Sequence, residues 1–81
     1  MNWKEYFISI IKQYGECYIN YLLGKTRATL HYRLEQPNDF IVKYFGRHEA
    51  YGCCRLDAEN LEEWIDFKNV TSITPNNIYK I

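Results

Sequence analysis

Long apolar runs and an excess of charge of either sign are both lacking in this sequence. Lys4 and Glu5 interrupt the N-terminal apolar stretch, and no run approaches the roughly 18 apolar residues that a membrane-spanning helix needs. We therefore expect no signal peptide and no membrane partner. Ten basic residues are balanced by ten acidic residues. General nucleic-acid binders are usually strongly basic, so this balance disfavours that class of protein.

Cysteine and glycine are scarce, and their spacing excludes several kinds of site. The three cysteines are an odd count, with Cys53 next to Cys54, which does not suggest a disulfide framework. Reduced thiols are typical of the cytoplasm, where we expect the protein to act. Neither the C-x-x-C nor the H-x-x-x-H spacing of zinc sites is present. The four glycines are isolated from one another, so we expect no phosphate-binding loop, no metal and no cofactor.

Apolar residues, by contrast, are abundant. They make up 47% of the 81 residues, and aromatic residues make up 17%, with eight tyrosines. This content predicts a packed core in a single domain over residues 1–81. We do not expect an enzyme, because enzymes this short are rare and no Cys and His pair has an evident orienting acid or oxyanion hole.

The stretch from Glu16 to Phe45 predicts three strands joined by two turns. Leu23-Gly24-Lys25-Thr26 places a glycine in a two-residue hairpin loop, and Gln36-Pro37-Asn38-Asp39 is typical of a second turn. Folding the chain at these turns fixes the strand register. The predicted partners are Glu16 with Arg33, Cys17 with Tyr32, Tyr18 with His31, Ile19 with Leu30, Tyr21 with Ala28, Leu23 with Thr26, Leu34 with Ile41, Glu35 with Phe40 and Leu30 with Phe45.

This register sorts the side chains onto two faces, because alternate residues of a strand point to opposite sides. One face is apolar apart from Lys43 and collects Cys17, Ile19, Tyr21, Ala28, Leu30, Tyr32, Leu34, Ile41 and Phe45. The second is mixed and collects Glu16, Tyr18, Asn20, Leu22, Arg27, Thr29, His31, Arg33, Glu35, Phe40, Val42 and Tyr44. Both turns, chosen independently, agree on which face is apolar.

Residues 3–14 predict an amphipathic helix, with Asn2 as its N-cap and Gly15 as its C-terminal stop. At about 100° per residue, Ile8 is the only apolar residue outside one arc. That arc contains Trp3, Tyr6, Phe7, Ile10, Ile11 and Tyr14. We expect it to pack on the apolar sheet face. The alternative is a helix that associates with a second copy of itself.

The C-terminal half predicts a fourth strand near residues 49–56 and a second short acidic helix near residues 58–67, with Asp57 as its N-cap. Ala50, Gly52, Cys54 and Leu56 are expected to face the core, and Glu49, Tyr51, Cys53 and Arg55 to face away. A competing interpretation makes residues 64–73 a strand that closes a barrel. Residues 70–81 are expected to supply one or two edge strands. The predicted fold class is α+β, with an antiparallel sheet of three to five strands and the N-terminal helix packed on one face.

Two surfaces are candidate binding sites. The first is the mixed sheet face, for which we select Tyr18, Arg33, Phe40, Tyr44, Tyr51 and Arg55. Tyrosine and arginine are common anchors of protein interfaces, and they also stack on nucleotides. The second is the acidic arc formed by Glu59, Glu62, Glu63 and Asp66, which could dock a basic partner such as a nucleic-acid-binding protein. The structural alternatives are a covered sheet face, a homodimer contact and an ordinary solvated helix face.

The order of helix, three strands and helix resembles that of double-stranded-RNA-binding domains. Such domains carry a basic cluster at the start of the second helix, where this chain has Asp57, Glu59, Glu62 and Glu63, so we do not expect their function. The order also resembles that of some small phage-encoded inhibitors of bacterial defence systems. The favoured function is therefore a non-enzymatic protein-binding module or a small inhibitor of a larger protein. The alternatives are a small nucleotide- or RNA-binding domain and a homodimeric structural domain.

Overall fold

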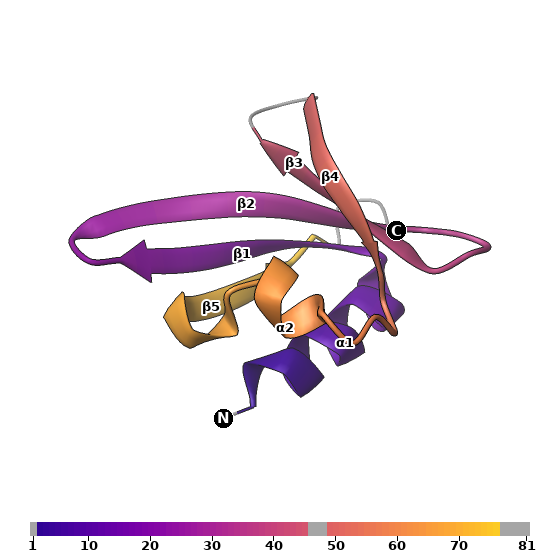
Figure 1. Ribbon diagram of the computed structural model, residues 1–81, viewed down its shortest axis with the longest axis horizontal. Coiled ribbons are helices and arrows are strands. Elements are labelled where there is room, and N and C mark those ends of the chain that lie inside the picture. Colours follow the sequence, from indigo (N-terminus) through magenta and orange to yellow (C-terminus); the bar gives the residue numbers. More distant parts are fainter. Residues whose placement is uncertain (1, 46–48, 77–81) are drawn as a thin grey trace.

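The computed structural model describes residues 2–45 and 49–76, apart from the side chain of Phe45, and shows the predicted α+β fold with a five-stranded antiparallel sheet (Figure 1). The elements in chain order are α1 (Trp3–Tyr14), β1 (Glu16–Leu23), β2 (Thr26–Glu35), β3 (Phe40–Phe45), β4 (Glu49–Arg55), α2 (Leu61–Trp64), a 3-10 turn η1 (Phe67–Asn69) and β5 (Val70–Pro75). The strands lie in the order β4-β3-β2-β1-β5.

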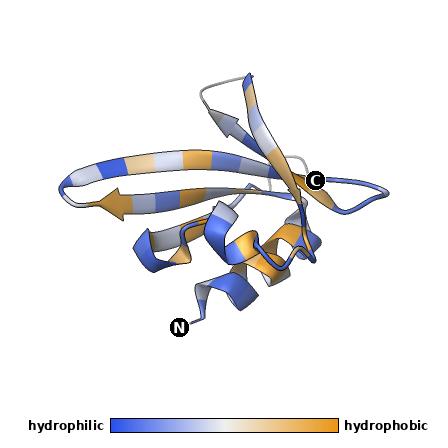
Figure 2. Cartoon of the chain, viewed as in Figure 1, coloured by the Kyte–Doolittle hydropathy of each residue, from blue (hydrophilic) through white to orange (hydrophobic). Residues whose placement is uncertain are grey.

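The register of the first three strands is the predicted one. β1 and β2 pair from Glu16 with Arg33 to Leu23 with Thr26, and β2 and β3 pair from His31 with Tyr44 to Glu35 with Phe40. Gly24 sits in the first turn at a φ of 64°, a conformation that glycine adopts without steric strain. Polar and apolar residues alternate along β1 and β2 (Figure 2). The predicted pairing of Leu30 with Phe45 lies beyond the paired residues and involves a side chain outside the described part.

Helix α1 has the predicted bounds and caps. The Asn2 side chain accepts a hydrogen bond from the Glu5 backbone N–H at 3.2 Å. Gly15 has a φ of 76°, and its N–H donates to the Ile11 carbonyl at 2.8 Å. These two residues satisfy backbone groups that the ends of a helix otherwise leave without partners.

The buried arc of α1 is rotated slightly from the predicted one. Phe7, Ile10 and Ile11 are buried as expected. Tyr6, placed by the prediction in the arc, is 37% exposed, whereas the predicted outlier Ile8 is partly buried against the core. The helical wheel predicts the buried side of α1 correctly, but the contacts of α1 with β1, β2 and β5 determine which residues lie at the edges of that side.

Strand β4 departs from the predicted alternation. Its pairing with β3 shifts so that Lys43 lies opposite Gly52 but Tyr44 lies opposite Ala50, which leaves Tyr51 as the extra residue of a β-bulge. The prediction that Ala50 faces the core is therefore wrong, and Ala50 is exposed.

The second helix is shorter than predicted. Only Leu61–Trp64 is α-helical, and its N-cap is Asn60 rather than Asp57, whose carboxylate instead pairs with Arg55. The backbone then becomes extended at Ile65, which lets that side chain reach the core. The competing interpretation of residues 64–73 as a barrel-closing strand is also wrong, because β5 pairs with β1 at the edge of an open sheet.

Both helices lie on the apolar face of the sheet (Figure 1). The fully buried side chains come from α1, the sheet and the α2 region: Phe7, Ile11, Cys17, Ile19, Tyr32, Ile41, Leu61 and Ile65. Tyr21 is buried next to Tyr32, and the two hydroxyl groups form a hydrogen bond of 2.6 Å with each other. A buried hydroxyl without a partner would be destabilising, so this pair fixes how the two strands pack.

Burial makes the stability of the fold sensitive to alkaline pH. It raises the pKa of the Cys17 thiol from 9.0 to about 12 and that of Tyr21 from 10.0 to about 12. A group with a raised pKa contributes stability that is complete below its unfolded-state pKa and is lost as pH rises through its folded-state pKa. We therefore expect the free energy of unfolding to fall between pH 9.0 and about 12.

Urea unfolding at a series of pH values measures this loss. Lys43 works in the opposite direction, because its pKa is lowered by burial, so the net fall tests whether the buried thiol and phenol groups dominate. In a Cys17→Val variant, the loss of stability just above pH 9.0 should be smaller than in the unaltered protein, because only Cys54, whose pKa burial also raises from 9.0, still contributes there before Tyr21 does near pH 10.0. Stability that stays level or rises across the whole range would contradict the burial of these groups.

Candidate functional site

A ladder of three aromatic rings crosses the mixed face of the sheet. The rings of Tyr18 on β1 and His31 on β2 are stacked, with centroids 4.7 Å apart and an interplanar angle of 20°. His31 in turn lies 5.3 Å from Tyr44 on β3. The ladder follows directly from the register, which places these three residues side by side on neighbouring strands.

Glu16 anchors the middle of the ladder. Its carboxylate pairs with Nε2 of His31, and the two side chains are only 15% and 19% exposed. The backbone of Glu16 lies opposite Arg33, as predicted. The Glu16 carboxylate, however, pairs with His31 rather than with Arg33. The ladder is thus held by stacking and by a half-buried polar contact, which limits the rotamers of its rings.

Phe40 and Arg55 lie together on the same face. The Arg55 guanidinium carbon lies 5.8 Å from the Phe40 ring centroid, and its Nε lies 3.1 Å from an Asp57 carboxylate oxygen. Arg33 is exposed, opposite Val42 in the register. The structure therefore brings five of the six selected residues to the mixed face: Tyr18, Arg33, Phe40, Tyr44 and Arg55.

Tyr51 is the exception. The bulge in β4 places its ring 5.3 Å from Nζ of Lys43, a side chain that also packs 4.4 Å from the Trp64 ring. Trp64 belongs to the helix side of the sheet, where it contacts Tyr32. The prediction that Tyr51 lies on the mixed face is therefore wrong.

A network of polar side chains extends the mixed face toward β5, and the sequence prediction missed it. Asn20 donates through Nδ2 to the Ser72 hydroxyl at 2.9 Å and accepts from the Thr29 hydroxyl at 2.6 Å. These bonds join three neighbouring strands. The alternation placed Asn20 and Thr29 on the mixed face, but only the position of β5 reveals Ser72 as the third member.

The four selected acidic residues do not form one helical arc. Glu59 precedes the short helix α2 and Asp66 follows it, whereas Glu62 and Glu63 lie within it. All four are exposed. The predicted arc assumed a longer helix, and its spacing is lost where the chain becomes extended after Trp64.

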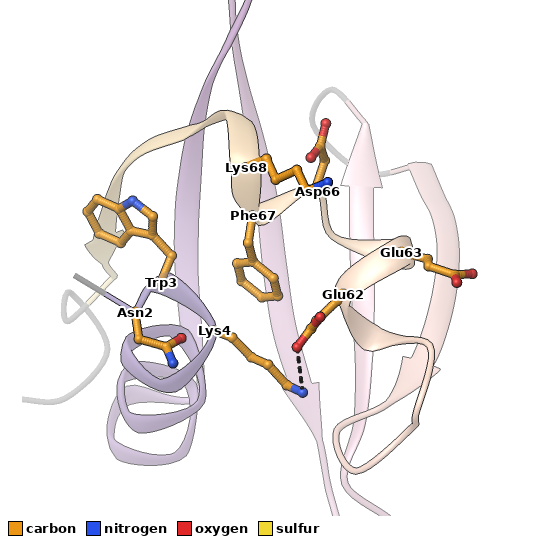
Figure 3. Close-up of a pocket in the computed structure, with 8 residues that line it drawn as sticks. All are labelled: Asn2, Trp3, Lys4, Glu62, Glu63, Asp66, Phe67 and Lys68. Atoms are coloured by element: carbon orange, nitrogen blue, oxygen red, sulfur yellow. Dashed lines mark hydrogen bonds and ion pairs between the residues drawn. The ribbon is translucent and has the colours of Figure 1, made fainter.

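Three of these acids line an open groove with a volume of about 940 Å³ between the start of α1 and the α2 region (Figure 3). Lys4 Nζ forms an ion pair with Glu62 Oε1 at 3.1 Å. Lys68 also lines the groove, with Trp3 and Phe67 as its aromatic members. Two lysines among three carboxylates leave the groove with little net negative charge, which weakens its fit to a basic partner.

Cysteines and potential metal ligands are the groups on which nucleophilic or metal chemistry would depend. No group of three potential metal ligands occurs among the described residues. All three cysteines are free, but burial raises the pKa of Cys17 to about 12, which disfavours its thiolate. Burial also raises the pKa of Cys54. Among the described helices, none has the length and apolar content to cross a membrane.

Comparison with known proteins adds no family: no family model, curated protein or solved structure matches this chain.

The ring ladder should behave as a coupled unit. We expect a double-mutant cycle of Tyr18→Ala and His31→Ala to give a coupling energy of about 0.5–1.5 kcal/mol, because the two rings stack directly. Urea unfolding of both single variants and the double variant provides the measurement. A cycle of Tyr18→Ala with Tyr51→Ala, whose strands are not neighbours, should be additive. Equal coupling in both cycles would contradict the specific stack.

Proposed function

We propose that this protein is a non-enzymatic binding module that docks a larger protein on the mixed sheet face. The observation that carries the proposal is the aromatic ladder of Tyr18, His31 and Tyr44 on the face opposite both helices. Tyr18 is 36% exposed and Leu22 is 41% exposed on the same face. Large apolar surfaces left open to solvent commonly mark interaction sites.

The charges on this face favour a protein over a nucleic acid. Its three arginines, Arg27, Arg33 and Arg55, are matched by three carboxylates, Glu16, Glu35 and Asp57. A phosphate backbone is attracted by uncompensated positive charge, which such a balanced surface lacks. Interfaces with proteins commonly combine aromatic side chains with arginine and a balanced polar rim.

The rigidity of the face supports the same function. Stacking and the contact of Glu16 with His31 order these rings before any partner arrives. Side chains that are already ordered lose less conformational entropy on binding, so more of the contact energy appears as affinity. Tyrosine adds a large contact area with few rotatable bonds.

A module of this kind could act as a small inhibitor by covering a surface of its larger partner. This matches the role of the phage-encoded inhibitors of bacterial defence systems that the element order resembles. Free cysteines fit a cytoplasmic setting. The exposed Glu59 and Glu63 would provide a secondary contact if that partner is a basic nucleic-acid-binding protein.

Alanine substitutions on the two sides of the sheet test the proposal. We expect Tyr44→Ala or Arg33→Ala to weaken partner binding at least about tenfold, because anchors at the centre of an interface dominate its energy. Tyr51→Ala is the matched control, since that exposed tyrosine lies off the mixed face, and it should bind normally. Partners are identified by affinity capture and mass spectrometry, and their affinities are then measured by calorimetry with variants whose folding is confirmed by circular dichroism.

Two further measurements distinguish the alternatives. A salt-sensitive RNA affinity that Arg33→Ala abolishes would favour the nucleic-acid hypothesis instead. A dimer mass in light scattering that Tyr44→Ala converts to a monomer would assign the face to a homodimer. Full partner binding by the Tyr44 and Arg33 variants would contradict the proposed face.

A further inference from the structure

A second candidate site lies on the opposite side of the sheet from the mixed face. The far part of the β1–β2 hairpin extends beyond the helices (Figure 1). The apolar face of this part contributes to a pocket of about 300 Å³. Leu23, Leu30 and Trp64 form apolar walls, and Leu23 is 48% exposed. This volume is at the lower end of the range for small-molecule sites, so it would hold only a small ligand.

Lys43 lines this pocket and, within residues 2–45 and 49–76, is the single basic residue on the otherwise apolar face of the sheet. It is only 9% exposed. Its Nζ donates a hydrogen bond to the Trp64 carbonyl at 3.2 Å and lies 4.4 Å and 5.3 Å from the ring centroids of Trp64 and Tyr51. An ammonium group has three N–H donors, so one carbonyl and two rings satisfy it only partly.

No described carboxylate forms an ion pair with Lys43, although the chain has ten acidic residues. Buried lysines are rare unless they are paired, because moving a charge out of water is costly. The lowered pKa of Lys43, which burial causes, is the expected sign of that cost. A largely buried lysine that forms no ion pair with a described carboxylate, beside an apolar pocket, is an arrangement that an anionic ligand would complete.

We propose that this pocket binds a small carboxylate with an apolar body. The carboxylate pairs with the Lys43 ammonium, and the body contacts Leu23, Leu30 and Trp64. The pair forms in a site partly shielded from water, where a charge-assisted hydrogen bond is stronger than at an exposed surface. The site does not depend on the protein-binding face, because the two lie on opposite sides of the sheet.

Asp66 also lines the pocket, and its charge opposes an anion. It is exposed and accepts a hydrogen bond from Asn69, so water and this bond screen part of the repulsion. Removing the charge of Asp66 should favour the proposed ligand, because the remaining repulsion is then lost. This gives a second substitution whose effect has the opposite sign to that of Lys43.

The test uses 1-naphthoate and its neutral analogue 1-naphthamide, which differ in the anionic group but share the apolar body. Titrations are followed by amide chemical shifts in two-dimensional NMR. We expect naphthoate to shift the signals of Lys43, Trp64 and Leu30 saturably, with an affinity at least about fivefold above that of naphthamide. Lys43→Met should remove this preference for the anion, whereas Asp66→Asn should increase it.

Lys12→Met, a change of an exposed lysine on α1, is the matched control and should leave both affinities unchanged. The naphthoate and naphthamide comparison on the unaltered protein keeps the test decisive if Lys43→Met does not fold. Equal affinity for the two probes, shifts confined to other residues, or no binding of naphthoate up to its solubility limit would each overturn the proposal. Weaker naphthoate binding by Asp66→Asn would do the same.

Discussion

The pairing of β1 with β2, closed at Gly24, is the constraint on which the rest of the structure depends. Strand side chains alternate with a period of two, so a shift of one residue would turn Ile19 and Tyr32 outward and bring Tyr18 and His31 under the helices. Helix α1 covers the face that carries Ile19 because that face is apolar. The helix also contacts β5, which pairs with the other edge of β1. A single register thus assigns one face to the core and leaves on the opposite face the residues that we propose bind a partner.

Local signals explain how much of the fold could be predicted from the sequence. Asn2 and Gly15 bracket a helix with a clear apolar stripe, and Gly24 dictates a hairpin register; none of these depends on distant residues. The bulge at Tyr51 could not be predicted, because no local sequence signal marks the shift in the pairing of β3 with β4. The early end of α2 could not be predicted from local signals either. Its continuation would keep the acidic arc intact, but burial of Ile65 in the core is accompanied by extended backbone there.

The candidate site shows the same division between local and tertiary determinants. Alternation alone placed Tyr18, Arg33 and Tyr44 on one face, and the register confirms this placement. The predicted register already paired Tyr18 with His31, but it did not show that the Glu16 carboxylate turns to His31 rather than to Arg33. Strand β3 links the two proposed sites: Tyr44 belongs to the ring ladder, and its neighbour Lys43 reaches the pocket on the other side. Lys43, the one residue that interrupts the predicted apolar face, is thereby the basis of the second proposed site.

Nuclear Overhauser effects between aromatic side chains in solution test most directly which face of the sheet lies under the helices. We expect contacts between the rings of Phe7 and Tyr32, whose centroids are 5.7 Å apart, and between those of Tyr18 and His31, whose centroids are 4.7 Å apart. The ring of Phe7 should show no nuclear Overhauser effect to the ring of His31. Contacts between Phe7 and His31, with Tyr32 exposed to solvent, would mean that the two faces are inverted and would contradict the assignment of both proposed sites.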